Sequence, residues 1–294
     1  MSAPNRRDLT LTQGDLKVSV SAQGASLLRT QWRGFPVLVP AGGPSGDAAC
    51  FPLVPFGNRI AGNRFDFRER SYGLAPNSGD PLILHGSGWL ADWNVVEAEE
   101  ENVELRLSSV ASACDPYAYD AFQQVSLSED CLSLTLRVTN RGDVALPFGV
   151  GFHPFFRWTA DLKVQMHTKA LWSEGEGHLP KARQKVPADL DFVAPRAVPA
   201  RWINNAFEGF GGKAQLYWPD IGLEVMLHCA PVFDVMMIHA APESLAATGN
   251  DFVCLEPMSH LPDAHNMPDL GGLSILEPGE VLSGTIAMHF RADA

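Results

Sequence analysis

Apolar and polar residues alternate along most of this chain, and this two-residue period limits the folds available to it. Residues 16–20 read Leu-Lys-Val-Ser-Val, and residues 132–138 read Leu-Ser-Leu-Thr-Leu-Arg-Val. Such alternation is typical of antiparallel strands with one buried face. No segment keeps a helical spacing of apolar residues with caps, so the sequence predicts an all-β protein. The same pattern predicts further strands at 26–32, 103–109, 122–128, 144–150, 162–168, 214–218, 222–228, 233–239, 252–256 and 281–290.

Two stretches without this periodicity, 40–65 and 171–212, are interpreted as long loops. The first carries Phe-Pro-Leu-Val-Pro-Phe at 51–56, and so many large apolar groups predict that it packs against the sheet and lines a cleft. All-β domains of about 200–250 residues are common, and no break in composition suggests a linker. Residues 1–294 are therefore predicted to form one large domain.

The composition narrows the choice of partners and compartment. A formal net charge of −12 disfavours nucleic acid and anionic membranes, and it mildly disfavours phosphorylated substrates. Five cysteines, an odd number without Cys-x-x-Cys spacing, favour a reducing compartment. The N-terminus has no apolar signal segment, and no apolar run reaches the about 18 residues that a membrane span needs. We expect a cytoplasmic protein, and both a monomer and a homodimer fit the sequence.

Two titratable residues that follow apolar segments and precede prolines are candidates for acid–base chemistry. His153 follows the predicted strand 144–150, and Pro154 has no N–H to donate to a sheet. Glu256 follows four apolar residues and precedes Pro257. A carboxyl group at the end of a buried strand loses hydration, which raises its pKa towards the range of a general base. The structural alternatives are a histidine of the core and a glutamate paired with an arginine.

Three further positions have side chains suited to binding a polar ligand. Asn58 and Arg59 close the apolar loop, and the planar fork of Arg59 can hold a hydroxyl or carboxylate or form a salt bridge that pins the loop. His85 precedes Gly-Ser-Gly, which allows the backbone a close approach to a ligand, although a loop histidine also bonds backbone carbonyls. The amide of Asn204 can orient a hydroxyl or form an Asx-turn.

Weaker signals come from the tryptophans and from a histidine-rich segment. His260, Asp263 and His265 are the nearest approach to a metal-binding cluster, but their spacing matches no zinc motif. There is also no nucleophile elbow, P-loop or dinucleotide fingerprint. Aromatic residues of β proteins belong more often to the core than to a binding site. Four tryptophans nevertheless have faces on which a sugar can stack, namely Trp89, Trp93, Trp158 and Trp202.

Four short motifs occur in a specific order and spacing along the chain. They are Asn-Arg-Ile at 58–60, Leu-His-Gly at 84–86, Gly-Phe-His-Pro-Phe-Phe at 151–156, and Leu-Glu-Pro at 255–257 with Asp-Ala-His-Asn at 263–266. In these motifs the chain resembles the aldose 1-epimerases, also called galactose mutarotases, over nearly its whole length. The resemblance implies a large antiparallel β-sandwich, the galactose mutarotase-like supersandwich, with an open cleft, no metal and no cofactor.

The resemblance also implies roles for individual residues. It makes His153 the general acid and Glu256 the general base, and it makes His85 and Arg59 ligands of the sugar. Asn58 and Asn204 join them as candidate substrate-binding residues. The family often has an aspartate where this chain has Asn204, and that departure removes a charge and leaves the sugar preference open.

Together these roles predict an isomerase that interconverts the α and β anomers of a free aldohexose. We expect Glu256 to take a proton from O1 and protonated His153 to give one to O5, from opposite sides of a sugar-sized gap. The rate should then fall at acid pH as Glu256 gains a proton, and at alkaline pH as His153 loses one. A glycosidase would need two carboxylates flanking the bond instead.

Three alternatives lead to other functions. Hexose-6-phosphate 1-epimerases tend to follow the His-Gly motif with Phe-Ala-Arg, where this chain has Ser-Gly-Trp at 87–89. A pocket wall with two or more arginines would support that alternative. A non-catalytic carbohydrate-binding or sensing protein on the same sandwich would need no acid–base pair. A metal-dependent enzyme would have to use His260, Asp263 and His265.

Overall fold

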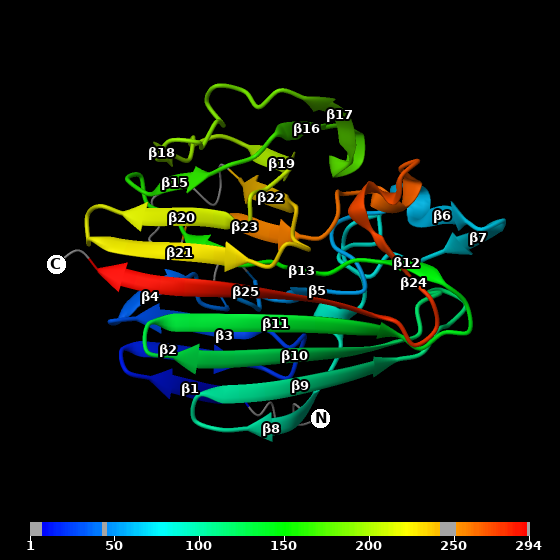
Figure 1. The fold of residues 1–294 in the computed structure, drawn as a ribbon, viewed down its shortest axis with the longest axis horizontal. Coiled ribbons are helices and arrows are strands. Elements are labelled where there is room, and N and C mark those ends of the chain that lie inside the picture. Colours follow the sequence, from blue (N-terminus) through cyan, green and yellow to red (C-terminus); the bar gives the residue numbers. More distant parts are fainter. Residues whose placement is uncertain (1–7, 43–45, 242–250, 293–294) are drawn as a thin grey trace.

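Two large antiparallel sheets contain most of the strands, so the predicted all-β architecture is confirmed. The computed structural model describes residues 8–42, 46–241 and 251–292. All strand pairs in this part of the chain are antiparallel. Figure 1 shows the two sheets as layers of a sandwich, with the smaller sheet in front.

The larger sheet has twelve strands. They are β1 (Leu9–Gln13), β2 (Leu16–Val20), β3 (Leu27–Trp32), β4 (Phe35–Leu38), β5 (Pro52–Leu53), β13 (Gly151–Phe152), β14 (Phe155–Arg157), β16 (Ala170–Glu174), β17 (Pro180–Gln184), β19 (Ile203–Glu208), β22 (Val235–Ala240) and β23 (Phe252–Met258). Their order is β1-β2-β3-β4-β14-β23-β22-β19-β16-β17, and β13 pairs with β23 and β5. This order places β23 near the middle of the sheet, between β14 and β22.

The smaller sheet has nine strands in the order β18-β15-β20-β21-β25-β11-β10-β9-β8. They are β8 (Asn94–Ala98), β9 (Asn102–Ser109), β10 (Tyr119–Ser128), β11 (Cys131–Asn140), β15 (Lys163–Met166), β18 (Arg196–Ala197), β20 (Lys213–Trp218), β21 (Leu223–Cys229) and β25 (Val281–Ala292). Most of these strands match segments that the alternating pattern predicts.

The remaining elements are short. Two small sheets pair β6 (Arg64–Phe67) with β7 (Arg70–Gly73), and β12 (Leu146–Phe148) with β24 (Ser274–Leu276). The 3-10 turns are η1 (Ala61–Asn63), η2 (Gly88–Leu90), η3 (Glu176–His178), η5 (Ala264–Asn266) and η6 (Leu270–Gly272). In the described ranges, none of the helices has the length and apolar character that crossing a membrane requires.

Strand β23 shows how the larger sheet separates a core from a second, outer face. Val253 and Leu255 pack into the main core, which residues of both large sheets share. Phe252 and Cys254, which point to the opposite face, join a smaller apolar cluster. Because successive side chains of a strand point to opposite faces, Glu256 shares the face of Cys254. The larger sheet therefore has a partly apolar outer face. A shared core is what the predicted single domain requires, and that organisation stays a prediction.

Three sequence predictions need correction. The run 144–150 is not one strand of a large sheet, because only Leu146–Phe148 is extended and it pairs with β24. The segment 171–212 is not a long loop, because it contains β17, β18 and β19 together with most of β16. Strand β23 also runs beyond the predicted end to Met258. By contrast, the loop 40–65 does pack against the sheet, as its buried Phe51 and Phe56 show.

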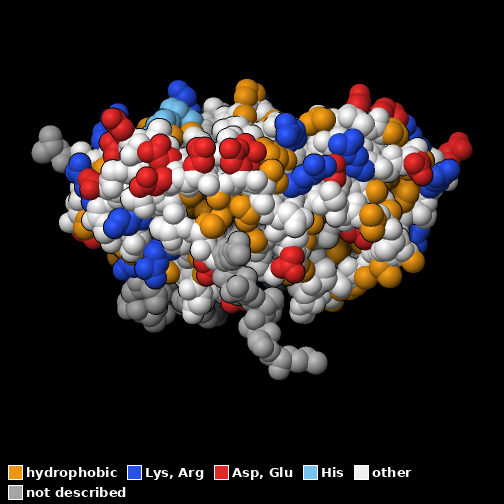
Figure 2. Space-filling view, turned by 90° about the horizontal axis from the view of Figure 1, so that it is seen from below, with side chains coloured by type: hydrophobic (Ala, Val, Ile, Leu, Met, Phe, Trp, Pro, Cys, Tyr) orange, Lys and Arg blue, Asp and Glu red, His pale blue; other side chains and the backbone are white. Residues whose placement is uncertain are grey.

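The acidic charge of the chain is partly concentrated at one edge of the sandwich. The turn between β8 and β9, at the end of the smaller sheet, exposes Glu99, Glu100 and Glu101, and Glu97 near the end of β8 is exposed beside them. Figure 2 views the molecule from this edge and shows a band of acidic side chains along one part of it, next to a group of basic side chains. An acidic surface disfavours phosphate-rich polymers, and the expectation that this protein binds none stays a prediction.

Candidate active site

All six residues predicted to bind or transform a substrate line a single cavity. It lies on the outer face of the larger sheet, where β14, β19, β22 and β23 meet the loops around residues 58 and 85, and its volume is about 210 Å³. Its lining consists of Asn58, Arg59, Leu84, His85, His153, Phe155, His178, Trp202, Asn204, Met237, His239, Phe252 and Glu256.

Glu256 is buried in the middle of the larger sheet. The prediction that it ends a strand is wrong, because β23 continues past Pro257 and pairs Glu256 with Met237 of β22. The residue is only 2% exposed. Burial raises the pKa of its carboxyl group to about 8, because the ionised form loses its hydration. The shift has the expected direction, but a central position in the sheet causes it.

His153 lies in the break between β13 and β14, where Pro154 interrupts the ladder before pairing resumes at Phe155. Its backbone N–H donates to the carbonyl of Phe51 over 2.9 Å. Its imidazole ring packs against both Phe51 and Phe155, with centroid distances of 4.7 and 4.6 Å, and those two phenyl rings are themselves neighbours at 6.1 Å. The aromatic neighbours therefore fix the plane of the imidazole, and the loop 40–65 supplies one of them.

The imidazole and the carboxyl group are direct neighbours. His153 Nε2 lies 3.3 Å from Glu256 Oε1. The expectation that a sugar-sized gap separates them is therefore wrong. Burial, with a smaller contribution from His85 and His239, holds the pKa of His153 well below its usual value. At neutral pH the pair thus holds one proton, and burial favours its residence on Glu256.

His85 is held in one tautomer by the backbone of Asn58. The N–H of Asn58 donates to His85 Nδ1 over 3.0 Å, and the N–H of His85 donates to the carbonyl of Asn58 over 2.9 Å. Burial lowers the pKa of His85 to about 3, so the ring is neutral with its proton on Nε2. Nε2–H is then the donor available to a ligand. These two hydrogen bonds use the backbone of Asn58, whereas its side-chain Oδ1 accepts a hydrogen bond from the backbone N–H of Arg59.

Gly86 explains how His85 comes so close to the loop 40–65. Its φ of +64° lies in the left-handed region, and a Cβ at this position would lie 2.6 Å from the carbonyl oxygen of Val54. Only glycine combines that backbone conformation with so close an approach. The close approach at Gly86 is to the Val54–Pro55 backbone, and the predicted approach to a ligand stays a prediction.

Arg59 forms the salt bridge that the structural interpretation predicted, and it also lines the cavity, so its binding of a ligand stays a prediction. Its Nε and Nη2 both donate to Oδ2 of Asp80, over 2.9 and 2.7 Å. Burial opposes the ionisation of Asp80, but the hydrogen bonds from Arg59 and the Leu82 backbone outweigh it and lower its pKa. Asp80 therefore neutralises much of the field of Arg59.

The segment 171–212 supplies one wall of the cavity, which the loop interpretation did not anticipate. Asn204 stands on β19, His178 ends η3, and Trp202 precedes β19. Of the four tryptophans considered for sugar stacking, Trp202 alone lines the cavity. His239, on β22, also lines it and is a further residue that the motifs did not single out. The only sequence signal for His239 was its position at the end of the predicted strand 233–239.

The residues considered for a metal site serve separate contacts. His260 Nε2 accepts from the N–H of Gly57 over 2.9 Å, and His265 Nε2 bonds the Tyr117 hydroxyl over 2.8 Å. Asp263 accepts from the N–H of Ala61. Each contact ties a loop to its neighbour, so these side chains act in packing the chain.

One group of metal-type donors does converge within the described ranges. His153, Cys254 and Glu256 are all buried, and one donor atom of each lies within 4.8 Å of the others. Burial holds the pKa of the Cys254 thiol well above its usual value. Because the thiolate is the form that binds metals, the protonated thiol makes this group a poor metal site.

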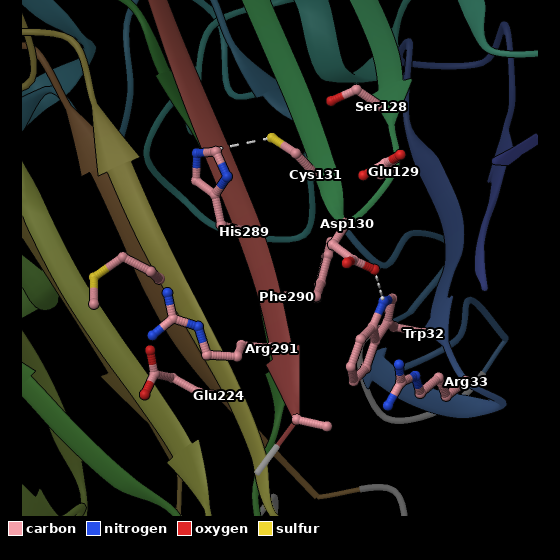
Figure 3. Close-up of a pocket in the computed structure, with 12 residues that line it drawn as sticks. Trp32, Arg33, Ser128, Glu129, Asp130, Cys131, Glu224, His289, Phe290 and Arg291 are labelled. Carbon is pink, nitrogen blue, oxygen red and sulfur yellow. Dashed lines mark hydrogen bonds between the residues drawn. The ribbon is translucent and has the colours of Figure 1, made fainter. Parts of the chain in front are cut away.

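A second, larger cavity of about 660 Å³ contains none of the six predicted residues. Figure 3 shows its lining, where Trp32 Nε1 donates to Asp130 over 2.9 Å and Cys131 Sγ lies 3.9 Å from His289 Nε2. The smaller cavity is the candidate active site, because it alone joins a buried carboxyl group to an imidazole among the predicted residues.

The sandwich of two antiparallel sheets, with its cavity on the outer face of the larger sheet, defines the galactose mutarotase-like fold. The sequence matches the aldose 1-epimerase family over residues 7–289. The chain belongs to that family. The predicted resemblance and the predicted fold are confirmed.

Individual relatives resemble the chain over its whole length. The Escherichia coli K12 protein YphB, itself described as uncharacterized, is 38% identical over 290 residues, which are 97% of this chain and 98% of YphB. A crystal structure from the same organism, provisionally assigned as an aldose 1-epimerase, has a TM-score of 0.92 at 36% identity and covers 98% of this chain and 100% of its own. Galactose 1-epimerase from Lactobacillus acidophilus has a TM-score of 0.81 at 15% identity, with 100% and 97% covered, which shows the shared fold.

Proposed function

We propose that the protein is an aldose 1-epimerase, which interconverts the α and β anomers of a free aldohexose without a cofactor. The observation that carries this proposal is the 3.3 Å contact between His153 Nε2 and Glu256 Oε1 at the cavity. An acid and a base in contact with each other can exchange protons with two neighbouring oxygen atoms of one ligand.

The reaction needs such a pair of adjacent groups. In the ring form of an aldose, O1 and O5 are both bonded to C1. One member of the pair takes the proton from O1 while the other gives a proton to O5, and the C1–O5 bond breaks to yield the open-chain aldehyde. Rotation about C1–C2 presents the other face of the carbonyl, and the reverse proton transfers close the ring. No covalent intermediate with the protein forms.

The single proton of the pair allows two arrangements. With the proton on His153, Glu256 is the base and His153 the acid, as the family resemblance implies. With the proton on Glu256, the roles are exchanged, and burial favours this neutral arrangement. The two forms differ by one proton transfer within the pair, so their titrations belong to the pair as a whole.

A pair that holds one proton at neutral pH predicts a pH dependence that differs from the one expected from sequence. The active one-proton form should persist from mildly acid pH up to about 8, because the pKa of Glu256 is raised to that value and that of His153 is lowered. Above it, the rate should fall about tenfold per pH unit as the pair loses its proton. The alkaline limb thus reports the loss of the one proton of the pair, which burial places on Glu256, and the acid limb reports the gain of a second proton by the pair, the reverse of the sequence expectation.

Initial rates by polarimetry, corrected for the uncatalysed reaction at each pH, would give the profile. Carbon-13 NMR of labelled glutamate carboxyl groups, assigned with Glu256→Gln, would follow the titration directly. A Glu256 carboxyl group that titrates near the ordinary value for glutamate, together with a rate that falls below pH 6, would contradict the one-proton pair.

The charges around the cavity favour a free aldose over a sugar phosphate. Among the described residues, Arg59 is the only lysine or arginine that lines the cavity, and Asp80 occupies two of its donor atoms. His85 is neutral, with one N–H to offer. The wall of several arginines that a phosphate would need is therefore not formed by these residues. Hydroxyl groups suit the donors and acceptors that remain.

The direct test is polarimetry of freshly dissolved α-D-glucose, α-D-galactose and glucose 6-phosphate with the wild-type protein. We expect catalysed mutarotation of at least one free hexose, at a kcat/KM at least about tenfold above that for the phosphate. The opposite order would establish the sugar-phosphate alternative. Binding of a hexose in saturation-transfer NMR without any gain in rate would establish a non-catalytic sugar-binding protein.

A further inference from the structure

One carboxylate beside the cavity collects hydrogen bonds from three residues that line it. Glu174, the last residue of β16, accepts from Asn204 Nδ2 and His178 Nδ1 at Oε1, each over 2.6 Å. Its Oε2 accepts from Trp202 Nε1, also over 2.6 Å. Glu174 itself is not part of the lining. The three donors belong to β19, to η3 and to the chain just before β19. The side chain of Glu174 therefore holds these three segments in fixed positions relative to one another.

These contacts determine which atoms face a ligand. An ionised carboxylate only accepts hydrogen bonds, so the amide of Asn204 must turn its NH₂ group towards Glu174. The amide oxygen Oδ1 is then left for the cavity. An aspartate at this position would also present an oxygen acceptor. The exchange of aspartate for Asn204 therefore preserves an acceptor for a sugar hydroxyl, provided that Glu174 holds the amide.

The aromatic part of the wall is fixed in the same way. The indole of Trp202 is anchored at Nε1, and the residue stays 39% exposed. Its ring lies edge to face with His239 at 5.3 Å and tilted against His178 at 5.7 Å. A rigid indole with an open face is a suitable surface for the C–H face of a pyranose.

Glu174 also places a negative charge at this wall. Burial opposes its ionisation, but the hydrogen bonds from His178, Asn204 and Trp202 outweigh burial and lower its pKa. Because Asp80 already neutralises Arg59, this carboxylate is left to repel anionic groups that approach the wall.

We propose that Glu174 is a positioning residue that builds a sugar-recognition subsite from Asn204, Trp202 and His178 and selects uncharged aldoses over anionic ones. This subsite rests on the proposed function for its ligand class, but its contacts lie apart from the His153–Glu256 pair. Its loss should therefore weaken sugar binding and leave the proton-transfer step largely unchanged.

The test compares Glu174→Gln with Glu208→Gln as a matched control. Glu208, on the neighbouring β19, likewise accepts from a tryptophan, Trp172, and from Arg183, and its side chain is 22% exposed against 20% for Glu174. None of these three control residues lines the cavity. Charge-assisted hydrogen bonds are the stronger kind, so we expect Glu174→Gln to raise the Kd for the preferred hexose at least about tenfold. Glu208→Gln should leave it unchanged.

Two further readouts separate positioning from general damage. KM should rise with Kd in Glu174→Gln while kcat stays within about threefold of wild type. Glucuronate should bind Glu174→Gln more tightly, relative to glucose, than it binds the wild-type protein. The double variant Glu174→Gln/Asn204→Asp should recover hexose binding relative to either single variant. It exchanges donor and acceptor, so the amide at 174 can donate to the carboxylate at 204.

Binding is measured by calorimetry or saturation-transfer NMR, so it does not depend on turnover. A Kd within twofold of wild type in Glu174→Gln would overturn the proposal. So would equal losses in Glu174→Gln and Glu208→Gln, or a double variant that binds no better than the singles. If the wild-type protein binds hexoses without accelerating mutarotation, the proposed function fails while the subsite is still tested by Kd. If it binds no hexose, both fail.

Discussion

Glu256→Gln is expected to lower the rate of mutarotation by at least about 100-fold. The amide has the size of the carboxyl group but cannot exchange a proton with O1, O5 or His153. The fold should survive the change, because burial already favours a neutral carboxyl group at this position, and glutamine resembles that form. The expected result is therefore a folded protein that binds sugar and does not accelerate ring opening.

Polarimetry on fresh α-D-glucose and α-D-galactose measures the effect, with circular dichroism and Tm as checks of the fold. Glu224→Gln is the matched control, because it removes a carboxylate from the larger cavity and should leave the rate unchanged. A near-wild-type rate for Glu256→Gln would exclude Glu256 from the chemistry. A large loss of rate in Glu224→Gln would instead indicate that the larger cavity takes part in the reaction.

The fold was predictable because the alternating pattern is a local property of each strand. In β10 and β11, every second residue is buried along most of both strands, and the register pairs Tyr119 with Asn140 through to Ser128 with Cys131. The pattern failed in β17, whose residues are half-buried or exposed throughout because it ends the larger sheet. An edge strand of this kind has no buried face to impose alternation, and the interior strand β19 is buried at Ile203, Asn204, Ala206 and Phe207 without alternating, so 171–212 looked like a loop.

Five of the six candidate site residues belong to the four short motifs, and Asn204 was proposed from its side chain alone, whereas the partners of these residues were not predictable. Asp80 lies 21 residues from Arg59, and Glu174 lies 30 residues from Asn204. Nothing in the local sequence links such pairs, which meet only when the strands assemble. The same holds for the protonation of the pair. A strand-end glutamate and a loop histidine suggested an ionised base and acid, but their burial side by side favours the neutral arrangement.

The substitution of Asn204 for the aspartate that the family often has at this position shows how sequence and structure complement each other. From the sequence, the change removes a charge from the pocket. In the structure, the carboxylate of Glu174 stands 2.6 Å behind the amide, so a negative charge is kept near the wall, one residue further from the ligand. If Glu174 builds the proposed subsite, the sugar preference should depend on both residues of this pair.

His153→Ala should lower the rate by at least about 100-fold, and added imidazole should restore part of it. Phe51 and Phe155 both pack against the imidazole and hold it in place, so removing its ring leaves a space lined by two aromatic rings. Free imidazole fits that space and can exchange a proton with Glu256. Loss of the stacked ring should lower Tm as well, so the rate must be measured well below the transition.

The rescue distinguishes a chemical role of His153 from a packing role. Imidazole should raise the rate of His153→Ala in a saturable way, and it should have no effect on Glu256→Gln, in which the other member of the pair is missing. Benzene-sized apolar additives fill the same space without a proton and serve as the control for packing. Equal rescue by imidazole and by such an additive would mean that His153 only supports the cavity. An unchanged rate in His153→Ala would remove the imidazole from the mechanism, because the pair would then not be the source of catalysis.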